Sequence, residues 1–176
     1  MSSTPAIAAL LREGVTHTVH SYEIEAPSGP DAHRGAKVAY GTAAAAALGV
    51  DPARLFKTLV VTLEGATTAP GAGPSLGVAV LPSSSSASMK LIAHALGAKR
   101  AALADAATVQ RVTGYVLGGV SPLGSRRVLP TVIDSSAADH ASILVSAGQR
   151  GLSIELAPAD LQRVAGATLA PIHEAT

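Results

Sequence analysis

Apolar residues recur along the chain with two spacings, one typical of helices and one typical of strands. The first helix is predicted from Thr4-Pro5 to Glu13, because Thr is a favoured N-cap, Pro fits the first turn and Gly14 follows as a stop. Further helices are predicted at 37–48, 89–96, 105–112 and 158–165, with a short helical turn at Asp51-Pro52.

Alternating and β-branched segments predict the strands, of which 55–63 is the strongest. The other strands are predicted at 15–24, 76–81, 99–103, 129–134, 142–146, 152–156 and near Thr168. Loops are predicted at 26–36, 65–75 and 113–127. Since helices and strands follow one another without regular βαβ order, the pattern predicts an α+β fold with a mixed sheet. The length of 176 residues fits a single domain over 1–176.

Composition narrows the class of protein. The chain is 48% hydrophobic and 14% charged, which is enough apolar surface for a core, but aromatic residues make up only 2%. Cysteine is absent, and this excludes a disulfide framework, a Cys-based metal site and a Cys nucleophile. No apolar run reaches about 18 residues and no secretion signal is evident, so we expect a cytoplasmic protein that does not enter the membrane.

Charge is unevenly distributed. Residues 90–150 carry seven Lys and Arg against three acids, a balance of +4, whereas the whole chain carries only +1. Affinity for nucleic acid grows with the number of phosphates neutralised, so this chain is not expected to wrap DNA or RNA tightly. The middle third is still expected to form a local basic patch.

Lys57 interrupts the apolar strand L-F-K-T-L-V-V. With a period of two, Leu55, Lys57 and Leu59 share one face of that strand. One interpretation is a lysine at a strand edge that reaches solvent. The other is a cation held in a polar pocket, where it binds phosphate or polarises a carbonyl.

The long loop contains the run Gly118-Gly119-Val120-Ser121-Pro122. Paired glycines allow backbone N–H groups to approach an anion or a carbonyl oxygen, while Ser121 adds a hydroxyl and Pro122 stiffens the bend. A plain connection is the alternative. Asp134 follows an apolar strand, and there it either faces a site or caps the next helical turn.

The loop at 113–127 matches neither a P-loop nor a nucleophile elbow, and the histidines do not show the spacing of a metal site. Ser125 stands where a P-loop has lysine, and Ser121 does not lie in a nucleophile elbow. His17 and His20 are three apart on a predicted strand and so face opposite sides. All six histidines are interpreted as polar surface residues, and no metal site is predicted.

Five segments together resemble the YbaK/EbsC family of aminoacyl-tRNA deacylases, in particular its Cys-tRNA(Pro) branch. They are F-K-T-L-V-V (56–61), A-L-G-A-K-R (95–100), T-G-Y-V-L-G-G-V-S-P-L-G (113–124), L-P-T-V-I-D (129–134) and S-A-G-Q-R-G-L-S-I-E-L (146–156). The resemblance implies a mixed β-sheet partly closed into a barrel and flanked by helices, with the site in a surface cleft. It implies no cofactor.

The resemblance also assigns roles to individual residues. Matching positions imply a catalytic role for Lys57, Gly118 and Gly119, and substrate contacts for Tyr22, Val120, Ser121, Pro122 and Asp134. The chain departs from the family at the 65–75 insertion, at Thr42-Ala43 and at 83–88. Of these, Thr42-Ala43 is the departure expected to alter the pocket rim and hence the amino acid accepted.

In the family, the thiol of the substrate cysteine attacks its own ester carbonyl, so that no protein nucleophile is needed. The resemblance therefore implies trans-editing of Cys-tRNA(Pro), with Cys-tRNA(Cys) as a second substrate. The implied partners are the tRNA acceptor end and prolyl-tRNA synthetase. Two alternatives stay open: a deacylase for alanine or serine that uses water, and a non-catalytic module that binds an aminoacyl or nucleotide-like ligand.

Overall fold

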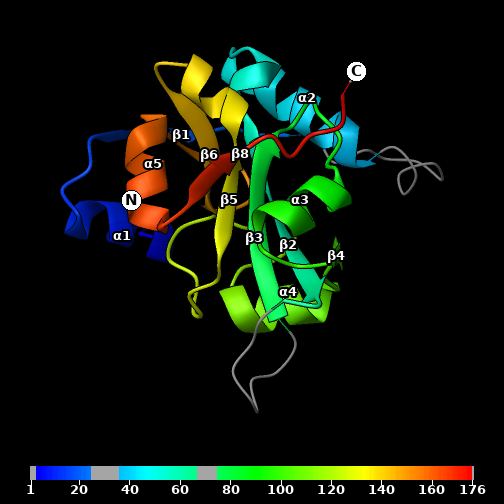
Figure 1. Cartoon of the computed structure of the whole chain (residues 1–176). Coiled ribbons are helices and arrows are strands. Elements are labelled where there is room, and N and C mark those ends of the chain that lie inside the picture. The colour runs from blue at the N-terminus through cyan, green and yellow to red at the C-terminus, as the bar shows by residue number, and fades with distance from the viewer. Residues whose placement is uncertain (1–2, 25–35, 67–74, 176) are drawn as a thin grey trace.

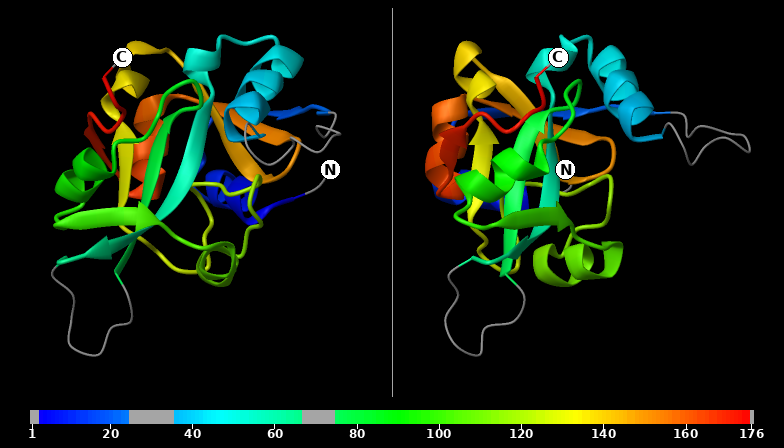
Figure 2. Two further views of the ribbon diagram at one scale, coloured as in Figure 1. Left: turned by 90° about the vertical axis from the view of Figure 1, so that its right-hand side faces the viewer. Right: turned by 45° about the vertical axis from the view of Figure 1, so that its right-hand side comes forward.

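The computed structural model describes residues 3–24, 36–66 and 75–175, apart from the side chains of 36–40 and 42. Its strands form two sheets (Figures 1 and 2). The smaller sheet is antiparallel throughout and contains, in spatial order, β1 (His17–Ser21), β7 (Leu152–Leu156) and β6 (Ile143–Gln149).

The larger sheet has five strands and mixed direction. Its order is β4 (Arg100–Leu103), β2 (Phe56–Glu64), β3 (Ser75–Pro82), β5 (Thr131–Asp134) and β8 (Thr168–Ala170). Pairing is antiparallel among β4, β2 and β3, and parallel from β3 through β5 to β8. The predicted α+β class with mixed strand direction is confirmed.

The helices begin and end where their caps require. The Thr4 hydroxyl accepts from Ile7 N at the start of α1, and Asp105 accepts from Thr108 N at the start of α4. Gly114 ends α4 in a left-handed conformation. The helices are α1 (Pro5–Arg12), α2 (Ala36–Leu48), α3 (Met89–Ala95), α4 (Ala106–Thr113) and α5 (Pro158–Ala165), with 3-10 turns η1 (Pro52–Arg54) and η2 (Ser135–Asp139). Each lies within one or two residues of its predicted position, and η2 is the helical turn that the capping interpretation of Asp134 predicted.

Aliphatic side chains fill three buried clusters. The largest lies between the two sheets and includes Phe56, Val80, Val145 and Ile154. The second lies on the other face of the larger sheet, beneath α3 and the C-terminal segment (Figure 2, left). The third joins α2 to the smaller sheet through Ala44, Ala45, Leu55 and Leu144. The core is thus built mainly from Ala, Val, Leu and Ile, as the low aromatic content predicted.

The expected closure into a barrel is not supported. Among the described residues, the two sheets are joined by one isolated bridge, a parallel contact between Leu55 and Leu144. The outer strands β1, β4 and β8 each pair on one side. The sheets therefore pack face to face over the main core and meet along one edge, without a continuous ladder.

Two other predictions differ at their boundaries. The strand predicted at 15–24 pairs only over β1, and β6 extends three residues beyond its predicted end, through a register shift between Ser146 and Gln149. The 65–75 insertion lies mostly outside the described residues, as does the loop at 26–36. In the part of the chain that is described, no helix has the length and apolarity needed to cross a bilayer.

Gly124 lies where the loop at 113–127 packs closely on the start of α1. It has φ +71°, and a Cβ added there would lie 2.6 Å from Pro5 O. Gly14 has a similar φ of +65° but open space around it. We expect Gly124→Ala to lower the free energy of unfolding by about 2–4 kcal/mol, because a backbone clash adds to the left-handed strain. Gly14→Ala should cost only about 1 kcal/mol. Urea unfolding of both variants measures this, and equal losses would contradict it.

Candidate functional site

Lys57 lies near the start of β2 and pairs with Leu81 on β3. It shares a strand face with Leu59 and Val61, which belong to the cluster beneath α3. Its side chain is half-buried, and Nζ donates to Ser85 O at 2.6 Å. The ammonium is therefore held by a backbone carbonyl of the fold, and its role as a cation in a polar pocket stays a prediction.

The segment that binds Lys57 is itself fixed by the C-terminal end of the chain. Ser88 N donates to Ile172 O at 2.9 Å, and Glu174 N donates to Ser86 O at 2.8 Å. Between these two bonds, Ala87 and His173 form an isolated antiparallel bridge. Residues 86–88 are thus paired with the C-terminal segment like a short extra strand.

Asp134 anchors that C-terminal segment. Its side chain is fully buried, and Oδ1 accepts from Ile172 N and His173 Nδ1, each at 2.9 Å. Oδ2 accepts from the N–H and hydroxyl of Ser136 and so caps η2. Burial alone would raise the pKa of Asp134, but these hydrogen bonds outweigh it and hold that pKa below its ordinary value. The capping interpretation describes Asp134, while its contact with substrate stays a prediction.

The diglycine, Gly118-Gly119, lies against the turn between β6 and β7. A Cβ on Gly119 would lie 3.0 Å from Arg150 N, and one on Gly118, where φ is +87°, would lie 2.9 Å from Arg150 Nε. Glycine is therefore needed for close backbone approach. Gly119 N donates to Val116 O at 2.9 Å, so this N–H is engaged within the loop. The proposed use of paired N–H groups toward a ligand finds no support at Gly119.

Residues 120–123 of the predicted loop are buried. Val120 and Leu123 join the main core. Ser121 is 1% exposed, and its Oγ accepts from Leu123 N at 3.3 Å. Pro122 is buried beside it. Ser121 thus supports the bend through its hydroxyl.

Tyr22 follows β1 and reaches the same turn as the diglycine. Its N–H donates to Gly151 O at 2.9 Å. Its side chain packs against the cluster that contains Leu55 and Leu144. Tyr22 therefore connects the β6–β7 turn with the junction between the sheets.

The strand register relates these pieces to Lys57. Leu55 forms an isolated parallel bridge with Leu144, so β2 begins beside β6. Ser146 pairs with Ser153, which in turn pairs with His20. Gln149, the neighbour of Gly119, follows Ser146 in β6 across a register shift. The bridge thus relates the start of β2 to the strand that leads to the β6–β7 turn, and a common cavity of Lys57, Tyr22 and the diglycine stays a prediction.

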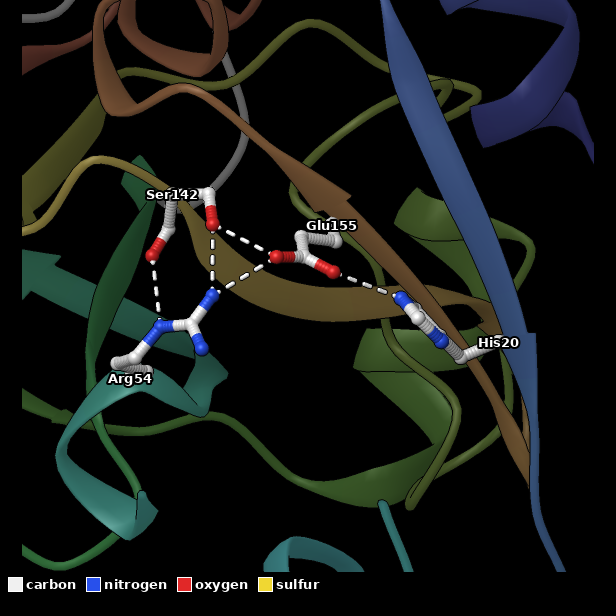
Figure 3. A network of polar contacts seen from close by, with 4 residues as sticks. All are labelled: His20, Arg54, Ser142 and Glu155. Carbon is white, nitrogen blue, oxygen red and sulfur yellow. Dashed lines mark hydrogen bonds and ion pairs between the residues drawn. The ribbon is translucent and has the colours of Figure 1, made fainter. Parts of the chain in front are cut away.

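A polar network that sequence reasoning missed lies on the smaller sheet (Figure 3). Glu155 Oε1 accepts from Arg54 Nη2 at 2.8 Å and from Ser142 Oγ at 2.7 Å, and Oε2 lies 2.8 Å from His20 Nε2. Arg54 also donates to the hydroxyl of Ser142 at 2.6 Å. Bonds from Ser142, His20 and Arg54 outweigh partial burial and lower the pKa of Glu155 to about 2. One signal was visible: Glu155 interrupts the strand S-I-E-L much as Lys57 interrupts its own.

Comparison with known proteins identifies relatives over most of the chain. A family model described as the aminoacyl-tRNA editing domain matches residues 36–164. A curated Enterococcus faecalis protein, EbsC, named as a candidate Cys-tRNA(Pro)/Cys-tRNA(Cys) deacylase, is 39% identical over 114 residues. That match spans 65% of this chain and 65% of the relative, just under two thirds of each.

Solved structures show the same fold. One, described as a candidate trans-editing enzyme for prolyl tRNA synthetase, has a TM-score of 0.78 at 19% identity, and the match covers 99% of this chain and 100% of the other. Another, described only as a hypothetical protein, has a TM-score of 0.76 at 24% identity, with 97% and 100% covered.

The Glu155 network predicts a specific acid sensitivity. Because the pKa of Glu155 in the folded protein, about 2, lies below its ordinary value of 4.5, its contribution is complete above pH 4.5 and is lost as the pH falls toward 2. Glu155→Gln should lower the free energy of unfolding at pH 7 by about 1–2 kcal/mol, a figure reduced for partial exposure, and the difference should vanish near pH 2.

Urea unfolding between pH 7 and pH 2 measures this difference. Asp160→Asn is the matched control, because Asp160 is more exposed and lies 3.6 Å from Arg163 on α5. The control should differ little from the wild type at any pH. A Glu155→Gln deficit that persists unchanged at pH 2 would contradict the prediction.

Proposed function

Because the chain belongs to the aminoacyl-tRNA editing domain family, we propose that it is a trans-editing deacylase that removes cysteine from mischarged Cys-tRNA(Pro). The observation that supports the proposal is the half-buried Lys57 ammonium, held by Ser85 O near the start of β2. The name of the E. faecalis relative and the description of the trans-editing structure support the same substrate class.

The side chains favour a reaction without a protein nucleophile. The chain has no cysteine, and the Ser121 hydroxyl is buried inside its turn. In the proposed step the substrate thiol loses its proton and its sulfur attacks the ester carbonyl. The carbon–oxygen bond to the ribose breaks, the ribose oxygen takes up a proton, and cysteine leaves as a cyclic thioester.

The protein's part in this step is electrostatic and positional. Negative charge develops on the carbonyl oxygen as the sulfur adds, and a preorganised cation in a partly desolvated place stabilises it. Lys57 supplies that cation. Since Ser85 O fixes Nζ before substrate arrives, little reorganisation is needed when the charge forms.

Prolyl-tRNA synthetase is the partner we propose. A net charge of +1 gives only weak attraction for free tRNA. Presentation of the mischarged tRNA by a synthetase would supply the affinity that this chain lacks. The similar trans-editing structure is described in terms of the same synthetase, in agreement with this arrangement.

Substitution of Lys57 tests the electrostatic role. Lys57→Ala should lower the rate of Cys-tRNA(Pro) deacylation by about 10²–10³-fold, the usual cost of removing one oxyanion-stabilising group. Ser121→Ala should keep most of the activity. Single-turnover deacylation measures both, with circular dichroism to verify folding. Equal collapse of the two variants would favour a serine nucleophile instead.

The product distinguishes the thiol route from hydrolysis. We expect Cys-tRNA(Pro) to release a cyclic thioester that an added amine can trap, while Ala- and Ser-charged tRNA(Pro) are cleaved far more slowly because they lack the thiol. Mass spectrometry of trapped products and a deacylation panel on the three substrates measure this. Rapid release of free alanine or serine would indicate a water-based deacylase, and no turnover of any substrate would indicate a binding module.

A further inference from the structure

A continuous basic strip runs from the end of α4 to the diglycine. Arg126 N and Arg127 N donate to Thr113 O and Val112 O, which places both arginines beside the last turn of α4 that carries Arg111. The Arg126 side chain then lies over Gly114.

The strip continues along the loop to the β6–β7 turn. Arg150 donates through Nε and Nη2 to Leu117 O, at 2.9 and 2.7 Å, and its side chain lies over Gly118. The arginines of this strip, Arg111, Arg126, Arg127 and Arg150, are all exposed.

Two arginines of the strip, Arg126 and Arg127, have no carboxylate close to them in the sequence. No Asp or Glu occurs between 106 and 133, whereas Arg111 interacts electrostatically with Asp105, the residue that caps the other end of α4. Within the described residues, Arg126 and Arg127 form no ion pair, whereas Arg54 and Arg163 each pair with carboxylates. Unpaired arginines are well suited to bidentate contact with phosphate.

Apolar side chains are exposed along the same loop. Val128 is 93% exposed, Leu117 49% and Val116 46%. Aliphatic side chains between arginines suit the sugar edge of a nucleic-acid strand. Exposed arginines that follow one loop complement the charge of a phosphate backbone, whose contacts position a nucleic acid without reading its sequence.

We propose that this strip binds the phosphate backbone of the tRNA acceptor stem and directs its aminoacylated end to the diglycine. The inference rests on the proposed function for the identity of the RNA. The position of the strip does not depend on that function, because the arginines follow one loop to Gly118. Four arginines give a weak, orienting interaction, consistent with the low net charge.

Salt dependence of RNA binding tests the proposal without any need for catalysis. Fluorescence anisotropy with labelled, uncharged tRNA(Pro) should give a slope of log Kd against log salt of about 3–4 for the wild type, about 0.9 per phosphate neutralised. In Arg126→Ala/Arg127→Ala the slope should fall by about 2, and the affinity at low salt should weaken roughly tenfold. Both positions are exposed, so the variant should fold.

The matched control is Arg12→Ala/Arg163→Ala, which removes the same charge from α1 and α5 and should leave the slope almost unchanged. An unchanged slope in the strip variant, or equal losses in both variants, would overturn the proposal. A strip variant that binds tRNA normally but loses binding to prolyl-tRNA synthetase would also overturn it, in favour of a protein partner.

Deacylation of a short aminoacylated CCA oligonucleotide separates this inference from the proposed function. The oligonucleotide lacks the stem, so the strip variant should cleave it at the wild-type rate while its KM for full-length Cys-tRNA(Pro) rises roughly tenfold with kcat unchanged. Equal impairment on both substrates would overturn the docking role. Absence of cleavage of both substrates by the wild type would overturn the proposed function, and the anisotropy measurement would then decide by itself whether the strip binds RNA.

Discussion

The contact between Leu55 and Leu144 is the constraint on which the arrangement of the site depends. It is the place where two otherwise separate sheets meet, and both side chains are buried in one cluster with Ala44 and Ala45 of α2. The bridge places the start of β2, two residues before Lys57, beside β6, the strand that leads to the turn against which the diglycine lies. Within the described residues, this one bridge joins the sheets and leaves them unclosed.

A second constraint acts on Lys57 from a distant part of the chain. Asp134 holds the C-terminal segment, that segment pairs with residues 86–88, and Ser85 O holds the ammonium. The buried carboxylate is stable as a charge because four donors surround it. The position of one half-buried cation is therefore determined by hydrogen bonds that cross the larger sheet and reach the end of the chain.

Local structure could be predicted because its causes are local. N-cap residues such as Thr4 and Asp105 and the apolar pattern of β2 fix elements within a few residues of their own position. The capping of η2 by Asp134 is also local and was predicted, but the bonds of Asp134 to Ile172 and His173 and the role of Glu155 could not be predicted in the same way, since those partners and His20 are far away along the chain. Barrel closure, expected from family resemblance, depends on edge pairing that the residues of β1, β4 and β8 do not specify by pattern alone.

The low net charge of the chain is compatible with the exposed arginine strip, because the net charge governs the overall affinity for RNA whereas the strip governs the orientation of the RNA. A net charge of +1 keeps the overall attraction to RNA low, because the acids elsewhere offset the basic middle third. A strip of four arginines within that field still gives a preferred direction, since close contacts with phosphate are screened less than distant ones. In the proposed docking, this combination orients the acceptor stem for a brief encounter and lets correctly charged tRNA leave quickly, so that the proposed thiol chemistry, and not tight binding, selects the substrate.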